Sequence, residues 1–235
     1  MVQHDKNPIR SWGLFACAAV AVMWLATAQG AAPDRRNSGS SGAAGGTAAQ
    51  QKPLAPPPLV PPTTESNAPH VRITTSEGAF VVALFPQRTP FTTANFLRYL
   101  DEGFYTGTLV HRVIGNFVIQ GGGYSAADSS LKATHDSIPN ESGSGLRNVR
   151  GTIGLARGDS PHSGNAQFYI NISDNPDLDP VPTRWGYAVF GRVIEGMEVV
   201  DRIGTAATGS VGTFKSDAPL KPIVIQKVER VATAP

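Results

Sequence analysis

The chain has 235 residues, with 20 basic and 18 acidic side chains and one cysteine. This length accommodates one ordinary domain and an additional segment. Residues 70–231 carry fifteen basic and fifteen acidic side chains, so this part is neutral and lacks the positive excess that nucleic-acid binding requires. It also has no cysteine, and we expect it to fold around a hydrophobic core without disulfides.

The first 28 residues have the pattern of an export signal. Lys6 and Arg10 precede an apolar run from Trp12 to Ala28, and small residues follow it. This order is typical of a secretory signal peptide, and we expect cleavage after Ala28. The apolar run is also close to the length that spans a bilayer, so the alternative is an uncleaved anchor, with membrane attachment through the N-terminus only.

Residues 29–69 differ in composition from both of their neighbours. They contain eight prolines and five glycines, with "SGSSGAAGG" passing into "PLAPPPLVPP". Such a segment cannot bury enough apolar surface to offset the entropy of ordering it. We therefore predict a disordered linker, flexible in its Gly/Ser half and extended in its Pro half.

From Val71 onward the pattern becomes one of short strands. "VRITT" and "AFVVALF", separated by "SEG", predict an antiparallel hairpin over 71–85. An amphipathic helix is then expected, with Thr89 as its N-cap, Pro90 at its first position and Gly103 as its stop.

The remaining elements are mostly strands. "EGMEVVDRIG" predicts a second, shorter helix that ends at Gly204. About eight strands with only two helices favour a mainly β fold, a closed antiparallel barrel, over a doubly wound sheet. The further strands are expected at 109–114, 117–121, 152–155, 167–171, 188–193 and 223–229.

The stretch "HRVIGNFVIQGGGY", residues 111–124, places Arg112 and Gln120 among Val, Ile and Phe. "GN" indicates a turn between two strands. With a three-residue loop over 114–116, Arg112 would lie opposite Val118 and share a sheet face with Gln120, and Phe117 would emerge at the turn. A two-residue loop would separate Arg112 from Gln120, and strand alternation alone leaves both arrangements open.

Four motifs in this order resemble those of the cyclophilin-type peptidyl-prolyl isomerases: "FYTGTLVHRVIGNFVIQGGGY", "GTIGLAR", "NAQFYIN" and "GYAVFGRVIEGMEVV". The resemblance covers residues 70–231, leaves 232–235 as a tail, and is greatest to the exported bacterial branch through "NESGSGLRNVRGTIGLAR". It implies an eight-stranded antiparallel barrel capped by two helices, with the site on the outer face. It also implies a periplasmic protein, or one anchored in the inner membrane and facing the periplasm.

The resemblance assigns roles residue by residue. The catalytic groups would be Arg112, Gln120 and Phe117. The substrate-binding residues would be Gln167, Tyr169, Leu178, Ala156, Arg157 and Tyr187, with the backbone of the Ala-Arg pair meeting the substrate. Two positions differ from the family's commonest pattern, because Asp177 stands where many members have a Trp that borders the pocket, and Tyr187 where they have a His. Trp185, in the longer loop that follows, is a candidate to supply the missing ring.

The resemblance implies a cofactor-free monomeric enzyme that isomerises X-Pro bonds in unfolded or loop segments of exported proteins. Its rival is a weakly active, cyclophilin-shaped binding or chaperone module, which Asp177 and Tyr169 in the pocket wall would favour. A tethered assembly factor is compatible with either. No metal site is expected, because His111, His135 and His162 lack metal-ligand spacing.

Overall fold

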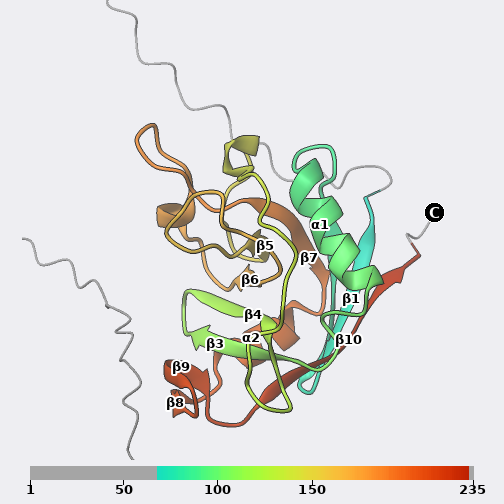
Figure 1. The fold of residues 1–235 in the computed structure, drawn as a ribbon, viewed down its shortest axis with the longest axis vertical. Coiled ribbons are helices and arrows are strands. Elements are labelled where there is room, and N and C mark those ends of the chain that lie inside the picture. The colour runs from blue at the N-terminus through green and yellow to red at the C-terminus, as the bar shows by residue number, and fades with distance from the viewer. Residues whose placement is uncertain (1–67, 233–235) are drawn as a thin grey trace, which may run out of the picture. The chain divides into compact units, whose positions relative to one another are not determined.

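A computed structural model describes residues 68–232, and its centre is a closed barrel (Figure 1). Neighbouring barrel strands are antiparallel and follow one another around it in the order β1-β10-β3-β4-β6-β5-β7-β2. The mainly β, eight-stranded barrel with two helices predicted from the sequence is therefore confirmed. The barrel strands are β1 (His70–Thr75), β2 (Gly78–Leu84), β3 (Thr108–Ile114), β4 (Val118–Ser125), β5 (Thr152–Leu155), β6 (Phe168–Asn171), β7 (Val189–Glu195) and β10 (Ile223–Val231).

The first helix, α1 (Pro90–Asp101), begins and ends close to the predicted residues, but its cap is different. The Thr89 side chain does not cap it, because its hydroxyl donates to the carbonyl oxygen of Phe85. Instead, the carboxylate of Glu141 accepts the N–H groups of Phe91 and Thr92, at 3.2 and 2.7 Å. A carboxylate at this position satisfies the free N–H groups and the positive end of the helix dipole.

The second helix, α2 (Met197–Gly204), is preceded by Gly196, which has a φ of +79°. This left-handed conformation favours glycine. The predicted element started two residues earlier, and it ends as expected at Gly204. Among residues 68–232, no helix is long and apolar enough to cross a bilayer.

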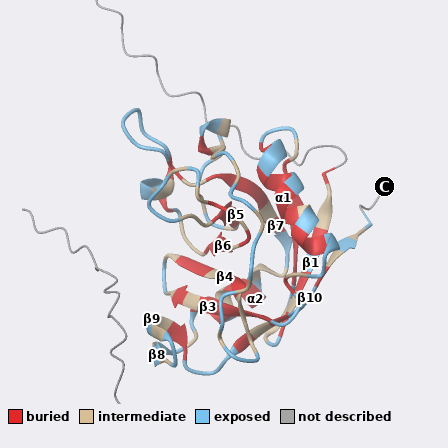
Figure 2. Cartoon of the chain, in the orientation of Figure 1, coloured by how far each residue is buried: buried red, intermediate tan, exposed pale blue. Residues whose placement is uncertain are grey.

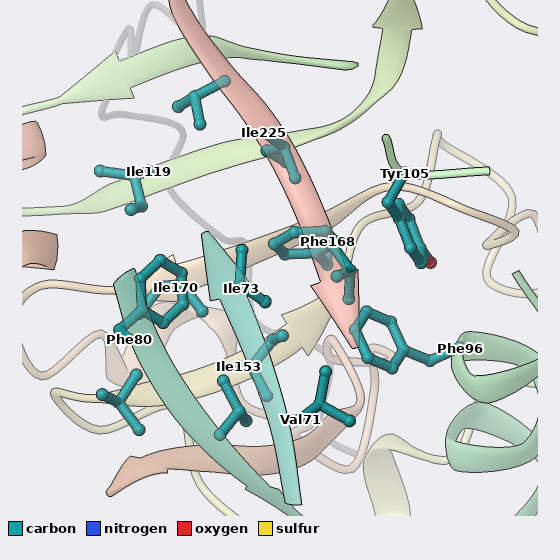
Figure 3. Packing of buried hydrophobic residues seen from close by; sticks show 14 of the residues in the cluster. Val71, Ile73, Phe80, Phe96, Tyr105, Ile119, Ile153, Phe168, Ile170 and Ile225 are labelled. Carbon is teal, nitrogen blue, oxygen red and sulfur yellow. The ribbon is translucent and has the colours of Figure 1, made fainter. Parts of the chain in front are cut away.

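Apolar side chains fill the inside of the barrel (Figure 3). Phe96 from α1 packs against Tyr105, Phe168 and Phe190, with ring centroids 5.1–5.7 Å apart. Figure 2 shows the buried residues along the barrel strands and along one side of α1. The void among Ile73, Phe80 and their neighbours measures only about 10 Å³, which is about the space of one water molecule, so this void cannot admit a peptide.

A two-stranded sheet lies outside the barrel and was not predicted. It is formed by β8 (Thr208–Val211) and β9 (Phe214–Pro219). Its sequence, "TGSVGTFKSDAP", has little apolar alternation, because most of the hairpin is exposed or half-buried. Phe214 packs against His111 and Tyr124 on the outer side of β3 and β4.

A β-bulge in β3 sets the direction of the Arg112 side chain. Val110 pairs with Gly121 and Arg112 with Gln120, so two steps along β3 correspond to one along β4. Val110 and Val113 both belong to the buried core, whereas Arg112 is only partly buried. In an unbroken strand Arg112 would share the core-facing side of Val110. Because of the bulge, Val110 and Val113 both point into the core while Arg112, between them, points outward.

The hairpin loop has three residues, as one of the two sequence alternatives required, but it is displaced by one position. Ile114 pairs with Val118, leaving Gly115, Asn116 and Phe117 in the turn. Arg112 therefore lies opposite Gln120, and its predicted pairing with Val118 is wrong. The predicted signal peptide or anchor over 1–28 and nearly all of the linker over 29–69 lie outside the described residues, as do positions 233–235 of the tail.

Candidate active site

Three side chains form a hydrogen-bonded row on the outer face of the barrel. Gln167, directly before β6, accepts at Oε1 from Gln120 Nε2, at 3.1 Å. Gln120 in turn accepts at Oε1 from Arg112 Nη1, at 3.2 Å. Within residues 68–232, Arg112 forms no ion pair, so two neutral amides position a charge that no carboxylate neutralises.

The glycine run that follows Gln120 makes room for this row. A Cβ on Gly123 would lie 2.5 Å from Cγ and 2.7 Å from Cδ of Gln167. These separations are far shorter than the 3.5–4.0 Å of a favourable carbon–carbon contact. A glycine is therefore needed at position 123 to leave Gln167 in place.

Phe117 is held at the turn through its carbonyl oxygen. This oxygen accepts the N–H of Ile172, at 3.0 Å, and Nδ2 of Asn175, at 2.9 Å. Asn116 precedes it with a φ of +58°, a left-handed conformation that Asn tolerates better than most residues. The hydrogen bonds of the turn thus fix the backbone position from which the half-buried Phe117 side chain extends.

Tyr169 on β6 lies between β4 and β5, opposite Gln120 on one side and Gly154 on the other. A Cβ on Gly154 would lie 2.3 Å from the tyrosine Cζ, so the ring lies across this glycine. Its hydroxyl donates to Asn148 Oδ1 at 2.6 Å. Burial raises the pKa of Tyr169 well above its ordinary value, so the phenol is neutral at physiological pH.

Asn148 connects Tyr169 to the loop on the other side of the pocket. Its backbone N–H and its Nδ2 both donate to Asp179 Oδ1, at 2.8 and 3.0 Å. Asn171 joins the same network by donating to Asn148 Oδ1. All four residues are less than 10% exposed, so this is a buried polar network in which each partner satisfies another.

The loop side of the pocket is completed by Leu178, Tyr187 and Arg157. Leu178 ends the short 3-10 helix η2 (Pro176–Leu178), and its carbonyl oxygen accepts the N–H of Tyr187 at 2.8 Å. Tyr187 meets Tyr169 edge to face, with ring centroids 6.1 Å apart. The guanidinium carbon of Arg157 lies 4.5 Å from the centroid of the Tyr187 ring, which is a cation–π contact.

These side chains surround an open pocket of about 260 Å³. This volume is slightly below the ~300–1,000 Å³ of sites that enclose a drug-sized ligand. All predicted site residues except Gln167 line it. Gln167 is hydrogen-bonded to Gln120, which does line it. Val118 also lines it and was not predicted. The lining residues are Arg112, Phe117, Val118, Gln120, Ala156, Arg157, Tyr169, Leu178 and Tyr187.

The structure shows where Asp177 and Trp185 lie relative to the pocket. Asp177 is exposed on η2 and is not among the pocket-lining residues. Trp185 does not supply a ring to the pocket either. Its side chain is 47% exposed and lines a different hollow of about 360 Å³ that includes Pro180, Val181 and Arg184.

The described residues contain no cluster of His, Cys, Asp or Glu that could hold a metal ion. The pocket therefore offers three kinds of chemistry: a guanidinium donor, amide donors and acceptors, and an apolar wall of Phe117, Tyr169 and Leu178. Such a site can grip an apolar ring and place a hydrogen-bond donor beside it.

The family model of the cyclophilin-type peptidyl-prolyl cis-trans isomerases matches residues 70–230 of this chain. The chain belongs to this family. It is 46% identical over 164 residues to peptidyl-prolyl cis-trans isomerase A of Dickeya dadantii, covering 70% of this chain and 85% of the relative. It is 45% identical over 157 residues to peptidyl-prolyl cis-trans isomerase B of Escherichia coli, covering 66% of this chain and 94% of the relative.

The fold agrees with solved cyclophilins. A cyclophilin-type isomerase of Cryptosporidium parvum superposes with a TM-score of 0.58 at 26% identity, covering 71% of this chain and 99% of the other. The same protein was also solved in the presence of the dipeptide Ala-Pro. The family predicted from the sequence is therefore confirmed, and with it the membership of an enzyme class, the peptidyl-prolyl isomerases.

Asn148 was the main omission of the sequence prediction. It lies inside the quoted motif "NESGSGLRNVRGTIGLAR", but an asparagine in a loop carries no local signal of burial. Its role depends on Asp179, 31 residues further along the chain.

Proposed function

We propose that this cyclophilin accelerates the cis-trans rotation of X-Pro bonds in exported proteins, with Arg112 as the group that stabilises the twisted amide. The observation that carries the proposal is an unpaired guanidinium beside an apolar pocket, oriented by two amides. The substrates would be X-Pro segments of unfolded chains or of loops.

The chemistry requires no bond to break. Amide resonance sets a barrier of ~18–20 kcal/mol, and the uncatalysed rotation takes roughly 10–100 s. When the amide twists, the proline nitrogen loses conjugation and gains a lone pair that the planar amide lacks. A donor placed there binds the transition state more tightly than the ground state, which is what lowers the barrier.

Arg112 suits this task because a guanidinium stays protonated at every physiological pH. Phe117, Tyr169 and Leu178 would hold the pyrrolidine ring. Gln120 and Gln167 would keep the guanidinium oriented, so that its position is set before the substrate arrives. A carboxylate beside Arg112 would compete with the proline nitrogen for the same donors.

The test is the isomerisation rate of a short X-Pro reporter peptide. Removing a donor that acts in the transition state typically costs 10²–10³ in rate, and we expect a loss of about this size in Arg112→Ala. Arg72→Ala removes an exposed arginine from β1 and should leave the rate unchanged. A slow wild type that Arg112→Ala does not slow further would instead support the binding or chaperone module.

We further propose a periplasmic location, because residues 1–28 have the composition of an export signal. N-terminal sequencing of the mature protein should begin just after Ala28. A mature chain that retains Met1 or Val2 and sediments with the inner membrane would support the anchor instead.

A further inference from the structure

Arg157 carries a second positive charge in the pocket wall, and the mechanism above does not use it. Its side chain donates to four main-chain carbonyl oxygens, with distances between 2.9 and 3.4 Å. The acceptors belong to Gly158, Asp159, Trp185 and Gly186. Together with the stacking on Tyr187, these bonds fix the guanidinium in one place.

These contacts orient the charge of Arg157 without cancelling it. A carbonyl oxygen is the end of a dipole and has no net charge, so four of them leave the guanidinium cationic. A guanidinium has five N–H donors, and the four bonds leave one on Nη2 without a partner among residues 68–232. The group can therefore still attract a negative ligand and donate a hydrogen bond to it.

The charges around the pocket favour an anion. Two guanidiniums, Arg112 and Arg157, line it, and no carboxylate does. Asp179 lies behind the wall, 9% exposed, where its Oδ1 accepts from Asn148. Asp177 is exposed and does not line the pocket.

The charge of Arg157 acts on Tyr169, which lines the same pocket. Burial is the largest cause of the raised pKa of the Tyr169 phenol, and Tyr187 and Asp179 act in the same direction. The positive charge of Arg157 acts in the opposite direction on that pKa. A substrate group that lies between Tyr169 and Arg157 would therefore feel the same field.

We infer that Arg157 makes this site prefer X-Pro segments with an acidic side chain directly next to the proline. The inference rests on the proposed function: with the proline ring against Phe117, the residue next to the proline would lie near Ala156 and Arg157, which line the same pocket. The positive charge of Arg157 would attract an acidic side chain at this place and repel a lysine.

The experiment uses two sets of reporter peptides that differ only at the residue before the proline or only at the residue after it. Each set contains Glu, Gln and Lys, and the catalysed rate is corrected for the uncatalysed rotation of the same peptide. In at least one set, kcat/KM should be roughly two- to fivefold higher for Glu than for Gln, as for a partly exposed ion pair. Lys should be slower than Gln, and 0.5 M salt should reduce the spread because it screens the charges.

Three variants identify the cause. Arg157→Gln should bring the Glu/Gln ratio close to one, whereas Arg157→Lys keeps the charge and should keep the preference for Glu. Arg184→Gln is the control, because it removes an arginine of the neighbouring loop between β6 and β7 that does not line this pocket, and it should leave the ratio unchanged. The ratio is measured within each variant, so a general loss of activity does not affect it.

The outcomes separate this inference from the proposed function. Equal rates for Glu, Gln and Lys in both sets would overturn the preference but leave the isomerase intact. A preference that survives in Arg157→Gln, that is lost equally in Arg184→Gln, or that is absent in Arg157→Lys, would overturn the role of the Arg157 charge. No catalysis of any peptide would overturn the proposed function itself.

Discussion

The two walls of the pocket are built in different ways. The strand wall consists of β3, β4 and the start of β6, where ladder pairing and a bulge place Arg112 and Gln120 side by side. The loop wall consists of η2 and the segment up to Tyr187, and a buried asparagine, Asn148, ties it to Tyr169. Backbone pairing thus fixes the position of Arg112, whereas side-chain hydrogen bonds fix the position of the Tyr169 ring.

The loop wall should be the more fragile of the two. Asn148→Ala would leave the buried Tyr169 hydroxyl without its acceptor and remove one donor from Asp179. Each unsatisfied buried group costs about 1–3 kcal/mol, and we expect a loss of about 2–4 kcal/mol in the free energy of unfolding, measured in urea. Asn95→Ala, where Nδ2 makes one hydrogen bond to a carbonyl oxygen, should cost about 1 kcal/mol. Equal losses would show that the network has no special role.

The strand wall has its own weakness, at acid pH. Burial, and to a smaller extent the charge of Arg112, lower the pKa of His111 to about 4. As the pH falls from 6.5 to 4, the unfolded chain takes up a proton that the folded chain does not, so stability decreases across this window. The decrease should be about 3 kcal/mol, and no further loss from this group is expected below pH 4.

The measurement is the free energy of unfolding against pH for the wild type and His111→Leu. The variant cannot take up this proton, so its curve should be flatter between pH 6.5 and 4. Parallel curves would contradict the lowered pKa of His111. Carboxylates such as Asp101, whose pKa is lowered mainly by its hydrogen bond to Arg230, titrate in both proteins and cancel in the comparison.

The amide row of the strand wall can be disturbed without touching Arg112. Gly123→Ala would push the Gln167 side chain away and separate it from Gln120. We expect kcat/KM to fall roughly tenfold through misplacement of the guanidinium, with a smaller change in stability. In Gly115→Ala, where the new Cβ would have its nearest neighbour 3.8 Å away, activity should be retained. If Gly123→Ala is as active as Gly115→Ala, the row does not position Arg112.

The smallest effect should come from Tyr169→Phe. The hydroxyl points to Asn148 and away from the apolar wall, and Asn148 Oδ1 keeps a donor in Asn171. We expect a loss of about 1 kcal/mol in stability and a rate within about twofold of the wild type, read from the reporter peptide. A large gain in rate would mean that the hydroxyl, and not only the ring, shapes the pocket.

The difference between the walls also explains what the sequence could predict. The barrel strands and α1 follow from local alternation and from turn residues, so their positions were predicted closely. The family motifs brought the pocket residues together, and all but Gln167 line one pocket. The loop of the β3–β4 hairpin begins one residue later than predicted, and strand alternation does not fix where a loop begins, so Arg112 was paired with the wrong residue. The bulge between Val110 and Arg112 also has no sequence signal.

The remaining errors come from contacts between distant residues. Glu141 caps α1 from 49 residues away, and nothing near Thr89 indicates that its hydroxyl turns back to Phe85. Asn148 and Asp179 meet only when two loops are folded over β5 and β6. The β8–β9 hairpin was missed because its exposed residues need no apolar pattern.

The central claim is that Arg112 acts on the twisted amide and not on the bound peptide as such. Exchange NMR on a reporter peptide separates the rate of rotation on the enzyme from the dissociation constant. For Arg112→Ala we predict a rotation rate lower by about 10²–10³, with a Kd within about threefold of the wild type, since a transition-state contact changes kcat rather than ground-state binding. A Kd that rises as much as the rate falls, or an unchanged rotation rate, would contradict the account.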